Sequence, residues 1–236
     1  MDKDIIIYSC IFGDYDKIKE PSFVDPKTSY ILFTDNPNLK SKVWDIKFVN
    51  LKELDLDIDL QRAARYIKTH PKSFLPPTHK INIWIDSSFL IKISNFNLLL
   101  SMILQKEDNF ACYKHGKENN RRTCLYDEAN FCIEKHLANS ILIQNQINKY
   151  KKEGFPKNFG LFSTGFLIRR NNEKTNNLNN IWWEEIKNGS KRDQISFTYC
   201  IWKLNFKVKE IGIGESIYNN PFLKKYKHIR EREVYD

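Results

Sequence analysis

The chain has 236 residues, of which 41% are hydrophobic and 14% aromatic, and this composition excludes a disordered or fibrous protein. Its formal net charge of +9 fits an anionic partner, such as nucleic acid, a phosphorylated small molecule or an acidic membrane surface, and it fits simple solubility equally well. A chain of this length can bury a substantial core and usually forms one domain or two small ones.

The N-terminal half alternates strand and helix signals. Runs of β-branched and aromatic residues predict strands over 4–12, 29–37, 43–51 and 81–86. Before the fourth strand, DLQRAARYIKTH (59–70) places its apolar residues on one helical face, and Asp59 is in position to cap its N-terminus. This order of elements predicts an α/β protein whose ligands bind beyond the carboxyl ends of its strands.

The C-terminal half is less regular. Apolar periodicity predicts helices over 95–105, 124–154 (two helices), 176–189 and 192–204. Strands are expected over 110–115 and 206–212. Residues 159–171 predict either a strand pair or one strand bent at Gly165. The charged tail 219–236 is expected to wrap the surface, and the absence of a repeat or a clear linker favours a single domain over 1–236.

Cysteine usage and hydropathy bear on the compartment. The five cysteines are odd in number and include no CxxC pair. The N-terminus MDKDIIIYSC has few apolar residues and no cleavage site, and the longest apolar run, NLLLSMIL (97–104), is too short to span a bilayer. We therefore expect a cytoplasmic protein, whose basic charge also suits peripheral contact with the inner face of a membrane.

The run INIWIDSSF (81–89) ends its expected strand on a carboxylate, Asp86. A carboxylate in this position is typical of nucleotide-sugar transferases, where it holds a divalent cation that neutralises the leaving diphosphate. The usual motif is Asp-x-Asp, whereas this chain has Asp86-Ser87-Ser88, so that Ser88 could ligate only weakly or through water. The alternative is a structural Asp86 that caps the following turn through backbone N–H groups.

Three further groups of polar residues are candidates for binding. Arg62, Arg65 and Lys68 are spaced three apart, so they share one face of the expected helix and could hold a diphosphate, or they form a solvated basic face. Later segments gather polar side chains around His115, Arg121, Arg122, Tyr126, Asp127 and Glu128, and around Arg192, Asp193 and Gln194. Asp193 lies where a helix begins, so it is either a cap or a base or substrate ligand.

Taken together, these motifs resemble a known family. IIIYSCIFGDYD, YILFTDNP, RAARYIK, IWIDSS, RRTCLYDEA, EGFPKNFGL, WWEEI and RDQISF occur in this order in the TOD1/MUCI70 glycosyltransferase-like domain family, over roughly residues 5–204. The resemblance implies a GT-A-like (Rossmann-like) fold with a mixed, mostly parallel sheet flanked by helices. It also implies a donor-nucleotide half over 1–92 and an acceptor half with the C-terminal tail over 93–236.

The resemblance further implies a role for each matching residue. The nucleotide base and ribose would be bordered by Tyr8, Ser9, Phe12, Gly13, Tyr15, Thr34 and Asp35. The donor phosphates would face Arg62, Arg65 and Lys68, and the substrate cleft would be lined by His115, Arg122, Tyr126, Glu128, Asp193 and Gln194. The catalytic candidates within this set are Asp86, Asp193, Glu128 and His115. A divalent cation, Mn²⁺ or Mg²⁺, would be held by Asp86 and His228, although the missing second carboxylate leaves metal dependence open.

The function expected from these residues is glycosyl transfer from a nucleotide sugar to a glycan or lipid-linked glycan, in the synthesis of a bacterial surface polysaccharide such as capsule or lipopolysaccharide. One alternative is a nucleic-acid-binding protein, but most aromatic residues lie in apolar elements and not among Lys and Arg, so we expect no nucleic-acid partner. The other is a metal-dependent phosphodiesterase or hydrolase, for which the sequence has no HxH, HD or HExxH motif.

Overall fold

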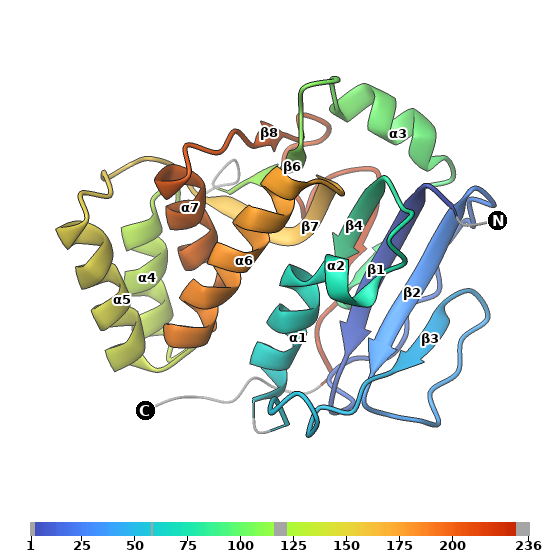
Figure 1. The fold of residues 1–236 in the computed structure, drawn as a ribbon, viewed down its shortest axis with the longest axis horizontal. Coiled ribbons are helices and arrows are strands. Elements are labelled where there is room, and N and C mark those ends of the chain that lie inside the picture. Colours follow the sequence, from blue (N-terminus) through green and yellow to red (C-terminus); the bar gives the residue numbers. More distant parts are fainter. Residues whose placement is uncertain (1–2, 58, 116–121, 230–236) are drawn as a thin grey trace.

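The computed structural model describes residues 3–57, 59–115 and 122–229 (Figure 1). Its centre is a seven-stranded sheet in the order β3-β2-β1-β4-β7-β6-β8. The strands are β1 (Ile5–Ile11), β2 (Thr28–Thr34), β3 (Asp45–Phe48), β4 (Ile81–Ile85), β6 (Phe110–Lys114), β7 (Phe162–Arg170) and β8 (Lys209–Glu210). Only β7 runs antiparallel to its neighbours in this sheet; all other pairs are parallel. The prediction of a mixed, mostly parallel α/β sheet is confirmed.

Helices cover both faces of the sheet. They are α1 (Leu60–Thr69), α2 (Pro71–Phe74), α3 (Phe96–Ile103), α4 (Leu125–Glu134), α5 (Ser140–Lys152), α6 (Glu173–Asn188) and α7 (Asp193–Lys203). Because side chains alternate along a strand, Ile6 and Tyr8 of β1 join the core under α1 and α4–α7, whereas Ile5 and Ile7 join the core under α3. In Figure 1, α1, α2 and α6 lie in front of the sheet.

A second, two-stranded sheet brings residues 223–225 close to the carboxyl end of β4. It pairs β5 (Phe89–Ile91) antiparallel with β9 (Leu223–Lys225). The backbone N–H of Tyr226 adds a hydrogen bond of 2.8 Å to the carbonyl of Ser88. The described part of the charged tail lies along the surface with mostly exposed side chains, and β9 also ties it to β5.

Two other predicted strands are shorter in the structure, and a third segment resolves between its two alternatives. The strand expected over 43–51 is limited to β3, a largely exposed edge strand, and that over 206–212 is limited to β8. Residues 159–171 contain one strand, β7, whose partner in β6 changes from Leu167 at Cys112 to Ser163 at Tyr113. Gly165 lies inside this irregularity, so the alternative of one strand bent at Gly165 is confirmed. Edge strands pair on one side only, so their length is set by tertiary contacts more than by local propensity.

The cysteines and helices bear on the predicted compartment. All five cysteines are free and buried. Among the described residues, no helix combines the length and the apolar character needed to cross a membrane. The cytoplasmic location stays a prediction.

Candidate functional site

A pocket with a volume of about 670 Å³ opens at the carboxyl edge of the sheet. The parallel strands β1, β2 and β4 end at this edge, and the antiparallel pairing brings the start of β7 and the end of β6 to the same place. The lining includes eleven of the residues predicted from the sequence: Phe12, Gly13, Tyr15, Arg65, Asp86, His115, Arg122, Glu128, Asp193, Gln194 and His228. Residues that are scattered along the chain thus meet in one cleft, as the strand order predicts.

Asp86 follows directly on β4 and faces this pocket. Its backbone N–H donates to the carbonyl of Gly165 at 2.9 Å, and its Oδ1 accepts a hydrogen bond of 2.7 Å from the indole of Trp84. Gly165 permits this approach, because a Cβ there would lie only 3.1 Å from Asp86 Oδ2. The carboxylate is therefore held by an indole and not by the turn N–H groups that a purely structural cap would use.

Lys68 joins Asp86 to Asp193 beneath the pocket. Its side chain is 0% exposed, and Nζ lies 2.6 Å from Asp193 Oδ2 and 3.6 Å from Asp86 Oδ1. Asp193 Oδ2 also accepts from Thr164 Oγ1 at 3.0 Å and lies 3.2 Å from Arg65 Nε. Asp193 is in the first turn of α7 but binds side chains there, so the alternative that it is a plain helix cap is wrong.

These contacts keep both carboxylates ionised. Burial acts to raise the pKa of Asp193, but the charges of Arg65 and Lys68 outweigh it and hold that pKa well below the usual value of 3.8. Burial likewise acts to raise the pKa of Asp86, and the same two cations hold it below its usual value. Both groups are consequently acceptors of hydrogen bonds at neutral pH.

Asp193 should therefore make the protein sensitive to acid. Because its pKa is lower in the folded chain, its stabilising contribution is complete above the unfolded value near 3.8 and is lost as the pH falls toward the folded value. We expect Asp193→Asn to reduce the slope of unfolding free energy against pH below about pH 4.5, by up to about 1.4 kcal/mol per pH unit for one proton. Urea unfolding between pH 3 and 7 measures this, and equal slopes in both proteins would contradict it.

The three cationic side chains of α1 do not form one continuous surface. Arg62 donates to the carbonyls of Lys187 (3.0 Å) and Gly189 (3.2 Å) and also contacts the carbonyl of Ile186. These groups end α6, where unpaired carbonyls and the helix dipole attract a cation. Lys68 is fully buried, so of the three only Arg65 lines the pocket. The prediction of one diphosphate-binding face made by all three is therefore wrong, and Arg65 is the member of the three that stays a candidate.

The loop after β1 forms another wall of the pocket. The N–H of Gly13 donates to both carboxylate oxygens of Asp35, at 3.0 and 3.1 Å. Gly13 has a φ of +58°, and a Cβ there would lie 2.3 Å from Leu60 Cδ1, so this tight turn requires glycine. Asp35 therefore shapes the turn and does not line the pocket, whereas the adjacent Phe12 and Tyr15 do.

Besides Arg62, Lys68 and Asp35, four more residues predicted at the site do not line the pocket. Tyr8 is fully buried and donates its hydroxyl to the carbonyl of Lys68 at 2.8 Å. Ser9 and Thr34 are buried within their strands. The Tyr126 hydroxyl donates to the carbonyl of Phe155 at 2.8 Å, away from the cleft. Alternation along the strands turns the first three side chains into the protein core.

The opposite wall comes from α4 and the segment before it. Glu128, whose side chain is 2% exposed, lies 2.6 Å from Arg122 Nε and 3.6 Å from an Arg192 nitrogen. The Arg122 guanidinium stacks 3.6 Å from the centre of the Phe131 ring. Two guanidinium groups are thus fixed at this wall by one buried carboxylate, which is an arrangement suited to oxyanion binding.

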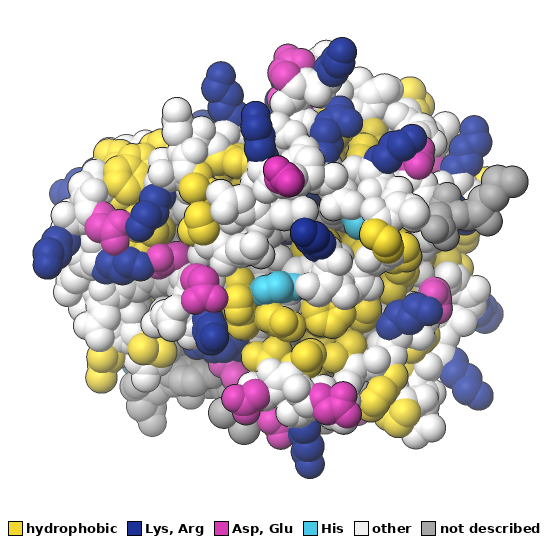
Figure 2. Space-filling view, viewed as in Figure 1, with side chains coloured by type: hydrophobic (Ala, Val, Ile, Leu, Met, Phe, Trp, Pro, Cys, Tyr) yellow, Lys and Arg dark blue, Asp and Glu magenta, His cyan; other side chains and the backbone are white. Residues whose placement is uncertain are grey.

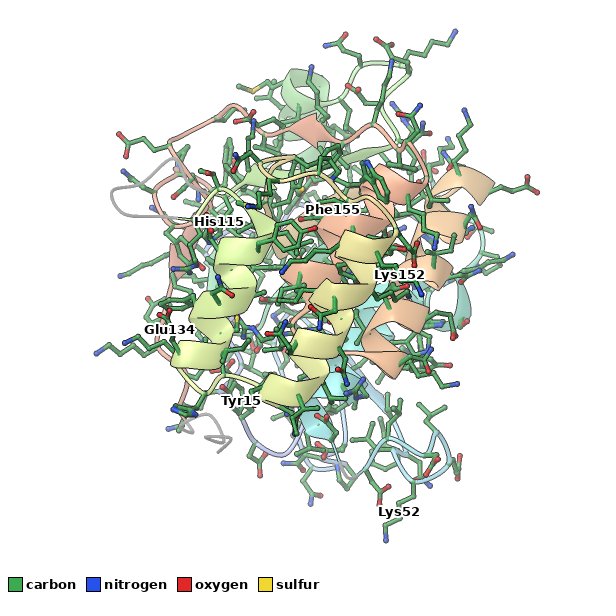
Figure 3. All side chains as sticks on the ribbon, turned by 90° about the vertical axis from the view of Figure 1, so that its left-hand side faces the viewer. Tyr15, Lys52, His115, Glu134, Lys152 and Phe155 are labelled. Atoms are coloured by element: carbon green, nitrogen blue, oxygen red, sulfur yellow. The ribbon has the colours of Figure 1, made fainter. Side chains whose placement is uncertain are left out.

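His115 lies beside the start of α4 (Figure 3). Its Nδ1 is 2.6 Å from the carbonyl of Arg122, and because a carbonyl only accepts hydrogen bonds, Nδ1 must carry a hydrogen. In the neutral ring the lone pair is then on Nε2, which makes His115 a candidate proton acceptor. Arg121, which belongs to the same sequence motif, lies outside the described residues.

The predicted metal ligands do not form a metal site. His228 Nδ1 lies 2.9 Å from Asp16 Oδ2, and its ring packs 4.7 Å from that of Tyr15. Asp16 also accepts from Ser87 at 2.5 Å. Within the described ranges, no group of three or more His, Cys, Asp or Glu residues is placed to hold a metal ion. The described residues therefore lack the three protein ligands of a preformed site for a divalent cation.

Lys225 carries no clear sequence signal, and Asp16 is marked only as the last residue of the motif IIIYSCIFGDYD. Asp16 follows the first strand in an ordinary polar loop, and Lys225 stands in a lysine-rich tail. Lys225 reaches the pocket through the pairing of β9 with β5, whereas Asp16 supports the pocket through its contacts with Ser87 and His228. A contact of this kind leaves no local pattern in a single sequence.

A mostly parallel sheet flanked by helices, with a polar pocket at its carboxyl edge, defines a Rossmann-like α/β protein consistent with the GT-A type. The profile of the TOD1/MUCI70, glycosyltransferase-like domain family matches residues 1–228. The chain belongs to this family.

Two similar proteins of Arabidopsis thaliana carry different functional names. The alkaline ceramidase TOD1 is 23% identical over 244 residues, which cover 90% of this chain and 52% of TOD1. The probable hexosyltransferase MUCI70 is 24% identical over 221 residues, which cover 83% of this chain and 37% of MUCI70. The chain thus spans about half of one relative and a smaller part of the other. The family and MUCI70 support a transferase.

Proposed function

We propose that the protein is a glycosyltransferase that moves a sugar, such as a hexose, from a nucleotide-sugar donor to a glycan or lipid-linked glycan. The observation that carries this proposal is the pocket itself, where ionised Asp86 lies among fixed guanidinium groups at the carboxyl edge of the sheet. Cations suit an anionic donor, and an ionised carboxylate suits the sugar hydroxyls. The name of MUCI70 supports a hexose as the transferred sugar. A bacterial surface polysaccharide as the product is the finer part of the proposal and rests on the family resemblance.

Each wall of the pocket has a proposed role. Phe12 and Tyr15 border the nucleotide, and Arg65 and Arg122 face its phosphates. Asp86, the most exposed carboxylate of its cluster at 29%, orients the sugar or accepts the proton of the acceptor hydroxyl. His115 is the second candidate for that proton, through Nε2.

Arg65 tests the proposed donor site directly, with Arg62 as a matched control on the same helix. We expect Arg65→Ala to weaken nucleotide-sugar binding by about 1–2 kcal/mol, or roughly 5- to 30-fold, because a charge-assisted contact is lost. Arg62→Ala removes a cation that binds α6, so donor affinity should not change. Thermal-shift titration against a panel of nucleotide sugars measures both effects, since a ligand of the folded state raises Tm. Equal affinities in wild type and Arg65→Ala would contradict this role.

Amide hydrolysis is the second candidate, because one relative is named a ceramidase. Such a reaction needs a metal-activated water or an activated nucleophile. The described residues form no three-ligand metal group, and near the pocket Asp16 stands between Ser87 and His228, which is not the order of a Ser–His–Asp triad. Incubation with ceramide and, separately, with nucleotide sugar plus glycan acceptor distinguishes the two. Fatty acid release without sugar transfer would reverse the preference.

The nucleic-acid alternative gains no support from the visible surface. Figure 2 shows Lys and Arg side chains dispersed over this face and interleaved with Asp and Glu, not gathered in one stripe. A binding face for a polyanion concentrates basic residues along a continuous track. On this face of the protein, the positive net charge is spread out.

A further inference from the structure

An ammonium group stands at the position where an Asp-x-Asp motif would place its second carboxylate. Asp86 is the first residue of the motif, and Ser88 is the third. The Nζ of Lys225 donates a hydrogen bond to Ser88 Oγ. Lys225 therefore brings a positive charge to the part of the pocket where other transferases of this type place a metal ion.

The backbone fixes Lys225 in this place. Lys225 pairs with Phe89 in the β5–β9 ladder, and Nζ lies 4.7 Å from the centre of the Phe89 ring. The hydrogen bond from Tyr226 N–H to the Ser88 carbonyl continues the same pairing. Lys225 and Asp86 line one pocket, and the charge of Lys225 is among those that oppose burial and lower the pKa of Asp86.

Asp86 and Asp193 already have cationic or hydrogen-bonding partners. Asp86 Oδ1 binds Trp84 and lies near Lys68, and Asp193 is held by Lys68 and Arg65. A divalent cation here would have to compete with these groups for its ligands, and the described residues provide no group of three ligands for it. Lysine binds phosphate as a point charge and needs no such ligand set.

We infer that Lys225 takes the place of a divalent cation, so that the diphosphate of the donor binds to this chain without metal. The inference rests on the proposed glycosyl transfer and deepens it. In that reaction the acceptor oxygen forms a bond to the anomeric carbon and loses its proton to a base of the pocket. The bond from the anomeric carbon to the phosphate oxygen breaks, and the nucleoside diphosphate leaves with the electron pair. The ammonium of Lys225 stabilises this added negative charge.

The test measures binding of uridine, guanosine, adenosine and cytidine diphosphates by isothermal titration calorimetry, once in EDTA and once in manganese. We expect the wild-type chain to bind one of them with the same Kd, within about threefold, in both buffers. Lys225→Gln should weaken that binding at least about tenfold in EDTA, whereas Lys225→Arg, which keeps the charge, should retain it. Lys224→Gln is the matched control, because Lys224 is the exposed neighbour on the same strand.

The possible outcomes separate the inference from the proposed function. Binding only in manganese would overturn the inference and leave the transferase proposal standing. Equal affinity of wild type and Lys225→Gln in EDTA would overturn the role of Lys225. Failure of the wild type to bind any of the diphosphates in either buffer would overturn both proposals. Circular dichroism and Tm confirm that each variant is folded. If Lys225→Gln is unstable, Ser88→Ala is the second variant. It removes only the hydroxyl that accepts from the ammonium and should cause a smaller loss of affinity.

Discussion

Replacing Asp86 with asparagine is expected to lower the rate of sugar transfer by about 100- to 1,000-fold, the effect of losing a proton acceptor or an ionic sugar contact. Asp86 is the carboxylate of its cluster that faces the cleft, with 29% of its side chain exposed compared with 7% for Asp193. The asparagine oxygen can still accept the hydrogen bond from Trp84 Nε1. The free energy of unfolding should therefore change by no more than about 1 kcal/mol.

Steady-state kinetics and urea unfolding of the same preparation check this prediction. Asp45→Asn is the control, since Asp45 lies on the exposed edge strand β3 and pairs only with Lys47. It should change neither activity nor stability. Full activity of Asp86→Asn would show that the pocket works without this carboxylate. A large loss of stability would show that Asp86 mainly supports the fold.

Removal of the Lys68 ammonium is the change with the largest expected effect on stability. Lys68→Met keeps the length and apolar stem of the side chain, but it leaves Asp193 and Asp86 without the cation that joins them. Breaking a buried ion pair on one side costs about 3–5 kcal/mol, and we expect the lower part of this range because Arg65 still contacts Asp193. The ammonium also lies 5.5 Å from the Trp84 ring, and this contact is lost as well.

A double-mutant cycle separates the ion pair from general damage to the core. Asp193→Leu removes the other partner, so the double variant Lys68→Met/Asp193→Leu should be less destabilised than the sum of the two single variants. A coupling free energy of about 1–3 kcal/mol is expected for groups in direct contact. Additive effects, measured by urea unfolding at pH 7, would show that the two side chains do not depend on one another.

The sequence predicts the sheet well, because the central strands have strong local patterns. The apolar run over 5–11 and the alternation over 81–85 become β1 and β4, and Asp59 caps α1 by accepting from Arg62 N at 3.0 Å. The short strands β5 and β9 were not predicted, because two or three residues carry no usable periodicity. Their pairing joins segments that are far apart in the chain. Ser88 and Lys225, which are hydrogen-bonded beside this ladder, are separated by 137 positions.

The sequence predicts the positions of the carboxylates at the site better than the roles of its cations. Asp86 and Asp193 stand at strand and helix ends, which the sequence marks. The roles of Arg62 and Lys68 could not be read from their spacing, because a helix face shows which side chains point together but not what packs against them. Here α6 and the two carboxylates pack against that face and engage both cations.

The short β5–β9 ladder has a consequence for the order in which the protein folds. Its strands are three residues each, and the chain between them runs from Ile91 to Leu223. Closing such a long loop costs conformational entropy, and the few hydrogen bonds of the ladder offset this cost only in part. Such a ladder forms after the main sheet and opens before it, as a local unfolding event of low free energy. Because Lys225 and His228 reach the cleft only while this ladder is closed, the wall they form is completed last and released first. The rest of the sheet can stay folded while this wall of the cleft opens and closes.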